Sequence, residues 1–520
     1  MSPVIRRVLV ANRGEIALRI IRACHEEGLE AVAVYSEADR LSPHVRAAQT
    51  AVALGPPPAA QSYLDGTKVI AAAKATGCQA IHPGYGFLSE RAAFAQAVAD
   101  AGLIFVGPPA SAIKAMGDKT EARRRMQAAG VPIVPGLTLP LRDVADARRE
   151  ATRLGYPVLL KAAAGGGGKG MRLVGAESEV EAAFAAAQSE ARKAFGDDAV
   201  YLEKYLIRPR HVEIQVLADT HGRVVALGER ECSIQRRHQK LIEEAPSTAV
   251  MPALRRRMGE AATAAAGAVG YVGAGTIEFL LMPTVGAGVG TGAGGGEFFF
   301  LEMNTRIQVE HPVTELVYGV DLVREQLRIA AGEPMRVRAG TMEPRGHAIE
   351  CRITADDPGN DFLPAAGVVQ YLRAPGGGGV RWDGGVEAGN EVTLFYDPLL
   401  AKLIVWAETR EAAIRRMRRA LRELVIVGLP TSQAFHLRVM DEPDFQRGDI
   451  DITYLERVGP RIMGAGKEVP PALARAVAVT AALLADERRA AGAARTPADG
   501  HGGGGLSAWM QVARREAIEP

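Results

Sequence analysis

Residues 159–172, LLKAAAGGGGKGMR, set a run of glycines and a lysine between two apolar segments. Several phosphate-binding loops contain such a combination. The dinucleotide fingerprint GxGxxG fits Gly165, Gly167 and Gly170, but that fingerprint requires a helix directly after the glycines. The residues that follow have the pattern of a strand, so we interpret the match as accidental.

Two positions exclude a P-loop. Ala163 stands where that loop needs its first glycine, and Gly170 follows Lys169 where serine or threonine is required. The remaining interpretation is a glycine loop between two strands, whose backbone amides can donate to phosphates and whose mobility lets it close over them. Lys161, on the entering strand, would point a cation at the same place.

A second glycine run, residues 286–296, also contains the dinucleotide spacing. It lies between two strand patterns as well. We interpret it as a low-complexity hairpin loop without chemistry, which shows that glycines alone do not define a site.

The wider pattern predicts a chain of α/β and α+β domains. Residues 1–116 alternate strand and helix, which is typical of a Rossmann-like, doubly wound domain. Residues 117–335 read as strands joined by long loops, with residues 224–240 as one strand, and an antiparallel or mixed sheet is expected. Residues 336–460 form a β-rich third domain, and residues 461–520 a helical extension with a flexible linker.

Composition narrows the class of protein. A chain of 520 residues with a net charge of +2 and mixed signs fits several folded domains and no nucleic-acid footprint. The four cysteines form no CxxC pair, as expected of reduced thiols in the cytoplasm. We expect neither a signal peptide nor a membrane span.

The strongest polar pattern is EMNTRIQVEH, residues 302–311, where polar side chains alternate with apolar ones. If this stretch is extended, five polar groups line one wall. A solvated edge strand has the same alternation, but the preceding EFFFLEM is too apolar for an exposed edge. Glu278, in the neighbouring strand pattern, adds a second carboxylate. Carboxylate and amide oxygens are ligands for Mg²⁺ (or Mn²⁺), so a metal site is expected here.

Cations gather in a second stretch, ERECSIQRRHQK. It contains Arg236, Arg237, His238 and Lys240, and His211 lies in another strand pattern nearby. A surface basic cluster explains this equally well on spacing alone. A site for a triphosphate and a second anion would need such cations.

These motifs together resemble the ATP-grasp fold, and more closely the biotin carboxylase family. The resemblance covers about residues 4–460 and rests on motifs that occur in the family's order: ANRGEIALRI, HPGYGFLSE, MGDK, KAAAGGGGKGM, EKYL, RHVEIQV, SIQRRHQK, EMNTRIQVEHPVTE and GHAIECRI. It implies that residues 117–335 are an ATP-grasp domain whose mobile glycine-rich lid spans about residues 134–204.

The resemblance also implies the site residues. Nucleotide contacts fall on Lys119, Lys161, Gly167, Gly168, Glu203, Lys204, Leu206, His211, Gln235 and His238. Metal ligands fall on Glu278, Glu302 and Asn304. Bicarbonate contacts fall on Lys240, Arg306, Gln308 and Val309, with Glu310 as the general base and Arg352 beside the biotin enolate.

The implied reaction is ATP-dependent carboxylation of biotin through carboxyphosphate, as the first half-reaction of an acyl-CoA carboxylase with acetyl-CoA as the expected acceptor. No lysine has the Met-Lys-Met setting of a biotin-bearing domain. We therefore expect biotin on a separate carrier protein, carboxyltransferase subunits on other chains, and a homodimer.

The sequence departs from the family at some positions. Ala163 and Ala164 begin the loop where Ser-Gly is common, and Lys169 replaces an arginine. The glycine-rich insertion 283–296 is unusual for the family and lies between the two strands that carry the expected metal ligands. Three alternatives stay open: another ATP-grasp ligase that forms an acyl phosphate, a nucleotide-binding subunit without catalysis, and a dinucleotide oxidoreductase.

Overall fold

The computed structural model describes residues 5–137, 139–162, 171–237, 239–282, 296–337 and 343–464, together with 475, 479, 480, 482 and 483. The chain divides into a compact unit, Met1–Met463, and a second unit, Gly464–Pro520. Most of the expected extension, the glycine loop around Gly167 and Gly168, His238 and the insertion 283–295 lie outside the described residues.

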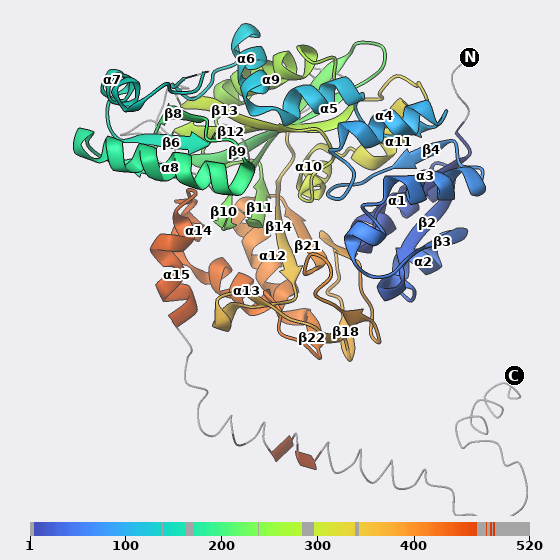
Figure 1. Ribbon diagram of the computed structural model, residues 1–520. Coiled ribbons are helices and arrows are strands. Elements are labelled where there is room, and N and C mark those ends of the chain that lie inside the picture. Colours follow the sequence, from blue (N-terminus) through green and yellow to red (C-terminus); the bar gives the residue numbers. More distant parts are fainter. Residues whose placement is uncertain are drawn as a thin grey trace, which may run out of the picture. The chain divides into compact units, whose positions relative to one another are not determined.

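The N-terminal segment forms a parallel sheet in the order β3-β2-β1-β4-β5. Figure 1 shows it in blue with its helices alongside. The elements are β1 (Arg7–Val10), α1 (Gly14–Glu26), β2 (Glu30–Ser36), α2 (Pro43–Ala47), β3 (Thr50–Gly55), α3 (Gly66–Ala75), β4 (Ala80–His82), α4 (Ala92–Asp100), β5 (Ile104–Phe105) and α5 (Ala110–Gly117). The predicted Rossmann-like arrangement is confirmed.

Two loops of this sheet meet through Asn12. Its side-chain amide donates to the carbonyls of Pro83 and Tyr85, each at 2.7 Å. Gly84 lies between them with φ +64°, and a Cβ there would sit 2.9 Å from Asn12 Nδ2. Glycine is required because it alone combines this backbone angle with so close an approach. The turn after β1 is therefore fixed against the turn after β4.

A small antiparallel sheet in the order β7-β6-β8 follows. Figure 1 shows α8 lying along it, and the two share a core that includes Leu160, Leu202 and Phe184. The elements are α6 (Lys119–Ala128), α7 (Val144–Leu154), β6 (Val158–Ala162), β7 (Met171–Val174), α8 (Val180–Phe195) and β8 (Val200–Lys204). β6 ends and β7 begins on either side of residues 163–170, so strands flank the glycine loop as the sequence predicts.

The central sheet is antiparallel and eight-stranded, in the order β13-β12-β9-β10-β11-β14-β21-β19. It contains strands from both the second and the third expected domain. Its strands and the helices between them are β9 (Arg210–Ala218), β10 (Val224–Arg236), β11 (Gln239–Ala245), α9 (Pro252–Gly267), β12 (Gly273–Met282), β13 (Glu297–Asn304), α10 (His311–Tyr318), α11 (Leu322–Ala330), β14 (His347–Thr354), β19 (Val380–Gly384) and β21 (Leu399–Ala407).

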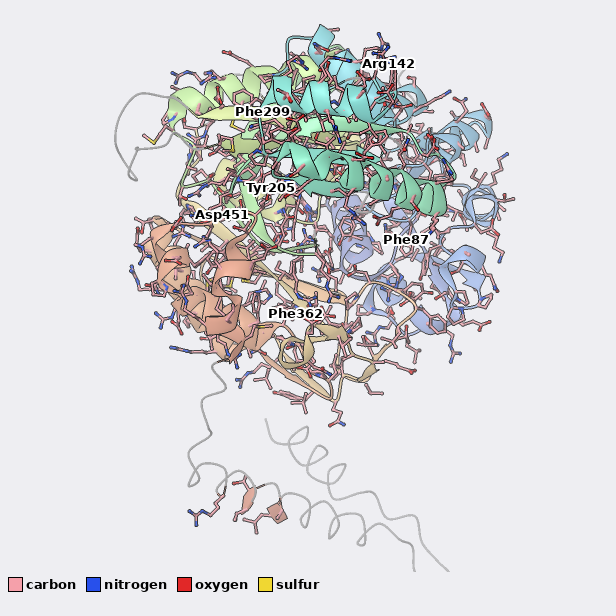
Figure 2. The ribbon with its side chains drawn as sticks, turned by 60° about the vertical axis from the view of Figure 1, so that its left-hand side comes forward. Phe87, Arg142, Tyr205, Phe299, Phe362 and Asp451 are labelled. Atoms are coloured by element: carbon pink, nitrogen blue, oxygen red, sulfur yellow. The ribbon has the colours of Figure 1, made fainter. Side chains whose placement is uncertain are left out.

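The remaining elements surround the last strands of this sheet. They are β15 (Asp356–Asp357), β16 (Leu363–Pro364), β17 (Gly367–Val368), β18 (Tyr371–Arg373), β20 (Glu391–Val392), α12 (Arg410–Glu423), β22 (Val425–Val427), α13 (Gln433–Asp441), α14 (Pro443–Arg447) and α15 (Tyr454–Gly464). Asp451, labelled in Figure 2 below the segment that follows β8, lies 2.8 Å from Arg208 and joins the loop before α15 to that segment. No helix in the described ranges is long and apolar enough to span a bilayer.

Two expectations about the strands need correction. Residues 224–240 are not one strand, because Arg237 has φ +50° and turns the chain from β10 into β11. The strand in EMNTRIQVEH ends at Asn304, so residues 305–310 are not extended. β13 is the edge strand of this sheet, but residues 132–133 lie against it, where the Phe300 amide donates to the Pro132 carbonyl at 2.7 Å, so the apolar strand is covered there as its sequence predicts.

A buried ion-pair network joins α12 to the central sheet and makes stability depend on pH. The Glu244 carboxylate accepts from Arg410 at 2.7 Å and lies 2.6 Å from His347 Nε2. Burial alone would raise the pKa of Glu244, but Arg410 and His347 lower it to about 2. Because the folded pKa lies below the unfolded one, this stabilisation is present above about pH 4.5 and is lost as pH falls towards 2.

Glu244→Gln is therefore expected to destabilise the chain by about 3 kcal/mol at pH 6 and by less at pH 3.5. Thermal unfolding of both chains at the two pH values measures this. Glu260→Gln, at an exposed position, is the control and should match the parent chain at both. If the difference in stability between the parent chain and Glu244→Gln were the same at both pH values, the Glu244 carboxylate would not be the source of the pH dependence.

Candidate active site

The centre of the site is a row of carboxylates across three neighbouring strands. Glu302 on β13 pairs in register with Glu278 on β12, and Glu278 pairs with Glu213 on β9. Directly opposed residues of antiparallel strands point to the same face of the sheet. The fold thus sets three acidic side chains in one line.

Lys240, the second residue of β11, connects this row to the next element. Its ammonium group donates to Glu213 at 2.6 Å, to Glu278 at 2.8 Å and to Glu310 at 2.7 Å. Glu310 immediately precedes α10 and is fully buried. A single cation therefore holds carboxylates from β9, β12 and the start of α10 together.

Arg352, on β14, completes the arrangement around Glu310. One of its guanidinium nitrogens donates to Glu310 Oε2 at 2.9 Å, and Nε donates to Glu243 Oε1 at 2.6 Å. Burial alone would raise the pKa of Glu310, but Lys240, Arg352 and Arg230 hold that pKa well below its usual value. Burial raises the pKa of Glu243 to about 7 despite Arg352. Glu310 is thus an ionised carboxylate between two cations.

Further predicted residues belong to the same network. His211 Nε2 lies 3.0 Å from Glu278 Oε2, and Gln235 Nε2 lies 2.7 Å from His211 Nδ1. Asn304 Nδ2 donates to Glu278 Oε1 at 2.9 Å. The structure therefore brings these residues from different strands into contact with one cluster.

Arg306 and Gln308 reach the cluster from the loop after β13. Arg306 donates to Gln308 Oε1 at 3.1 Å and to Asn304 Oδ1 at 3.3 Å, and it pairs with Glu90 at 2.9 Å. The carbonyl of Val309 accepts from Lys402 Nζ at 3.0 Å. The polar residues of EMNTRIQVEH meet at the site although the segment is not a strand throughout.

The other predicted nucleotide contacts lie on the small sheet and on α6. Lys161 on β6 forms an ion pair with Glu203 on β8. Lys204 Nζ donates to the carbonyls of Gly155 and Tyr156, so its ammonium group is engaged by main chain. Leu206 is half-buried just beyond β8, and Lys119, which begins α6, is exposed. Gly167, Gly168 and His238 lie outside the described residues.

The predicted metal ligands fit a divalent cation on charge. Opposed like charges destabilise a strand pair, and the charge of Glu278 raises the pKa of Glu302. In the described part of the chain, the Glu302 carboxylate forms no hydrogen bond or ion pair, whereas Glu213 is held by Lys240 and Arg230. The ligand atoms of His211, Glu213 and Glu278 also lie within 4.8 Å of one another. Glu278 belongs both to this cluster and to the predicted ligand set of Glu278, Glu302 and Asn304. The unpaired carboxylate of Glu302 favours the predicted set.

Glu302→Gln tests this fit without an assay of catalysis. Removal of the like charge should raise stability in chelator by about 0.5 kcal/mol, while Mn²⁺ affinity in the presence of ADP falls at least about tenfold because a carboxylate ligand is lost. Thermal unfolding and electron paramagnetic resonance of bound Mn²⁺ measure the two effects. Unchanged Mn²⁺ affinity would remove Glu302 from the ligand set.

Sequence reasoning missed three residues of the site. Arg230 is fully buried and donates to Glu213 at 2.5 Å, to Gln215 at 2.7 Å and to Thr314 at 2.9 Å. The other two are Glu213, which accepts from Lys240, and Glu243, which accepts from Arg352. A signal was present in RHVEIQV, where His211, Glu213 and Gln215 alternate with apolar residues just as the residues after Glu302 do.

The fold and the site together define an ATP-dependent ligase of the ATP-grasp class: two strands on either side of a glycine-rich segment, a lysine on the entering strand, and carboxylates on adjacent strands of an antiparallel sheet. Comparison with known proteins agrees. Residues 4–113 match the biotin carboxylase N-terminal domain, residues 118–338 the ATP-binding domain of the carbamoyl-phosphate synthase L chain, and residues 350–457 the biotin carboxylase C-terminal domain.

Individual relatives are similar over most of their length. Biotin carboxylase of Haemophilus influenzae is 52% identical over 454 residues, which are 87% of this chain and 98% of the relative. The chloroplastic biotin carboxylase of Arabidopsis thaliana is 50% identical over 449 residues, which are 86% of this chain and 82% of the relative.

Among solved structures, the biotin carboxylase domain dimer of Hydrogenobacter thermophilus 2-oxoglutarate carboxylase, in complex with MgADP, ADP and bicarbonate, superposes with a TM-score of 0.81. It is 45% identical and covers 88% of this chain and 99% of that one. The chain belongs to the biotin carboxylase family. It is an ATP-dependent ligase that carboxylates biotin, as the sequence predicted.

Proposed function

We propose that this chain carboxylates biotin held on a separate carrier protein and so performs the first half-reaction of a biotin-dependent acyl-CoA carboxylase. Acetyl-CoA is the proposed final acceptor, and carboxyltransferase subunits on other chains would use the product. A cytoplasmic homodimer is part of the proposal. The four buried free cysteines and the dimeric H. thermophilus relative support it.

The observation that carries the proposal is the Lys240, Glu310 and Arg352 arrangement. An ionised carboxylate held by two cations can accept a proton once an anion draws those cations away, because its pKa then rises. Bicarbonate bound by Lys240, Arg306, Gln308 and the amide of Val309 would do this. Glu310 would take its proton, and the resulting oxyanion would attack the γ-phosphorus of ATP to give ADP and carboxyphosphate.

Arg352 then acts on the second substrate. Carboxyphosphate separates into CO₂ and phosphate, and the phosphate takes the proton of the biotin ureido nitrogen. The biotin oxygen gains negative charge in this step, and a guanidinium beside it lowers the barrier. The nitrogen attacks CO₂ to form carboxybiotin. Arg306, which already contacts both Gln308 and Asn304, would orient the two substrates.

The nucleotide would lie between the small sheet and the carboxylate row. Lys119 and Lys161 would contact its phosphates, and the glycines 167 and 168 would close over them. Glu203, Lys204 and Leu206 would surround adenine, the Lys204 contact coming from its main chain because its ammonium is engaged. His211, Gln235 and His238 would complete the pocket. Mg²⁺ held by Glu278, Glu302 and Asn304 would neutralise charge on the transferred phosphoryl group.

The proposal also includes the limits of the domains. We propose the Rossmann-like domain at 1–116, the ATP-grasp domain at 117–335 with its lid at about 134–204, the C-terminal domain at 336–460 and the extension at 461–520. The ion pair between Lys161 and Glu203 joins two strands of the lid. Lid closure would bring that pair towards the central sheet.

Phosphate release from Mg-ATP by the purified chain tests the proposal. Release should depend on bicarbonate and rise further with free biotin. Release that ignores bicarbonate would contradict the proposal and favour another ATP-grasp ligase.

A further inference from the structure

A second concentration of positive charge lies on α12, away from the active site. The helix contains six arginines among its fourteen residues. Its apolar face packs into the core of the C-terminal segment through Ala413, Ile414, Met417, Ala420 and Leu421. Figure 1 shows α12 beside β14 and β21, and the outer face of the helix carries the charge.

A cavity of about 420 Å³ opens on this outer face. Its lining is almost entirely cationic: Arg373 from β18 and Arg415, Arg418, Arg419, Arg422 and Glu423 from α12. The four helical arginines recur at spacings of three and four residues, so they share one face over about 10 Å. We call this group the arginine cavity.

The charges of the arginine cavity are not balanced within the protein. Asp441 pairs with Arg418 at 2.6 Å, and Glu423 pairs with Arg419 at 2.7 Å. No carboxylate of the described residues pairs with Arg373, Arg415 or Arg422; Arg373 has only long contacts, 3.3 and 3.4 Å, with the Glu423 carbonyl. Like charges three and four residues apart destabilise a helix, so this surface gains from a bound anion.

The two other arginines of α12 show that the imbalance is local. Arg410 pairs with Glu244 at 2.7 Å, and Arg416 donates to the carbonyl of Trp406. Both have a partner inside the fold. Along this helix, the two arginines with no carboxylate or carbonyl partner among the described residues, Arg415 and Arg422, both line the arginine cavity.

A glycine loop borders the cavity beside Arg419. Arg419 Nη2 donates to the carbonyl of Gly376 at 3.0 Å. A Cβ at Gly377 would lie 3.5 Å from the same nitrogen, and Gly377 has φ +95°. Because the loop carries no side chains here, it leaves the guanidinium groups accessible and holds one of them in place.

We propose that the arginine cavity binds a small ligand with two or more phosphate groups. The planar guanidinium fork matches phosphate oxygens, and several such groups meet in a short concave space. The volume suits a small molecule, whereas an acidic segment of a protein partner would need a longer surface. This site is separate from the carboxylate row and does not rest on the proposed function.

The test uses the full chain and calorimetric titration with tripolyphosphate, with saturating MgADP present to occupy the nucleotide site. The parent chain should bind one equivalent. Arg415→Gln/Arg419→Gln/Arg422→Gln should bind at least about tenfold more weakly, since three guanidinium groups that can form charge-assisted hydrogen bonds to phosphate are lost. Arg415→Gln/Arg422→Gln, which spares the partnered Arg419, should weaken binding in the same direction.

The matched control removes the same charge elsewhere. Arg40, Arg256 and Arg336 are exposed and lie outside the cavity, so their triple glutamine variant should bind like the parent. Absence of binding to the parent chain, or an equal loss in the control, would overturn the proposal. Tighter binding of an oligoglutamate peptide than of tripolyphosphate would also overturn it, in favour of a protein partner.

Discussion

Glu310→Gln is expected to lower bicarbonate-dependent ATP cleavage by about three orders of magnitude, at the upper range for loss of a general base. The amide cannot take the bicarbonate proton, so the attacking oxyanion does not form. ATP affinity should stay within about threefold, because no nucleotide contact is assigned to Glu310. Single-turnover ADP formation and ADP binding measure the two effects.

Glu325→Gln is the matched control for this change. Glu325 is also buried and accepts from an arginine, Arg328, at 2.9 Å, but on α11. Its loss should alter stability rather than the chemical step. If Glu310→Gln retained cleavage, or if both variants lost it equally, Glu310 would not be the base.

Arg352→Ala is expected to lower biotin carboxylation by about 100- to 1,000-fold, as when one charge-stabilising donor is removed. Bicarbonate-dependent ATP cleavage should fall by less than about tenfold, because Lys240 still holds Glu310. Loss of the Arg352 charge also removes the ion pair that Glu243 forms with it.

Arg352→Lys separates these effects because it keeps a charge but loses the forked donor. Compared with Arg352→Ala, the lysine variant should regain more of the lost stability than of the lost rate of biotin carboxylation. An equal loss of cleavage and carboxylation in Arg352→Ala would move the residue from biotin to bicarbonate. The ratio of the two rates in each variant is the quantity to compare.

Local patterns predicted much of the fold. The alternation of strand and helix in residues 1–116 and the strands on either side of the glycine loop appear as the sequence predicts. The sequence could not place β13 at the edge of the sheet, because the covering contact between Pro132 and Phe300 joins residues far apart in the chain. Nor did it show the tight turn at Arg237.

The site was predicted where functional residues share a short motif, as Arg306, Gln308 and Glu310 do. The structure brings them together through the loop after Asn304 and not through strand alternation, so the geometry expected of this segment was partly wrong. Arg230 was missed because its partners come from three other elements. Only the folded sheet reveals that Glu213 needs this cation.

The most direct test of the account is transfer of labelled bicarbonate to free biotin by the purified chain with Mg-ATP and no partner protein. The account predicts acid-labile label in carboxybiotin, formed together with ADP and absent when Glu310→Gln replaces the parent chain. Bicarbonate-dependent ADP formation by the parent chain without any label in biotin, even when a biotinylated carrier is supplied, would contradict it.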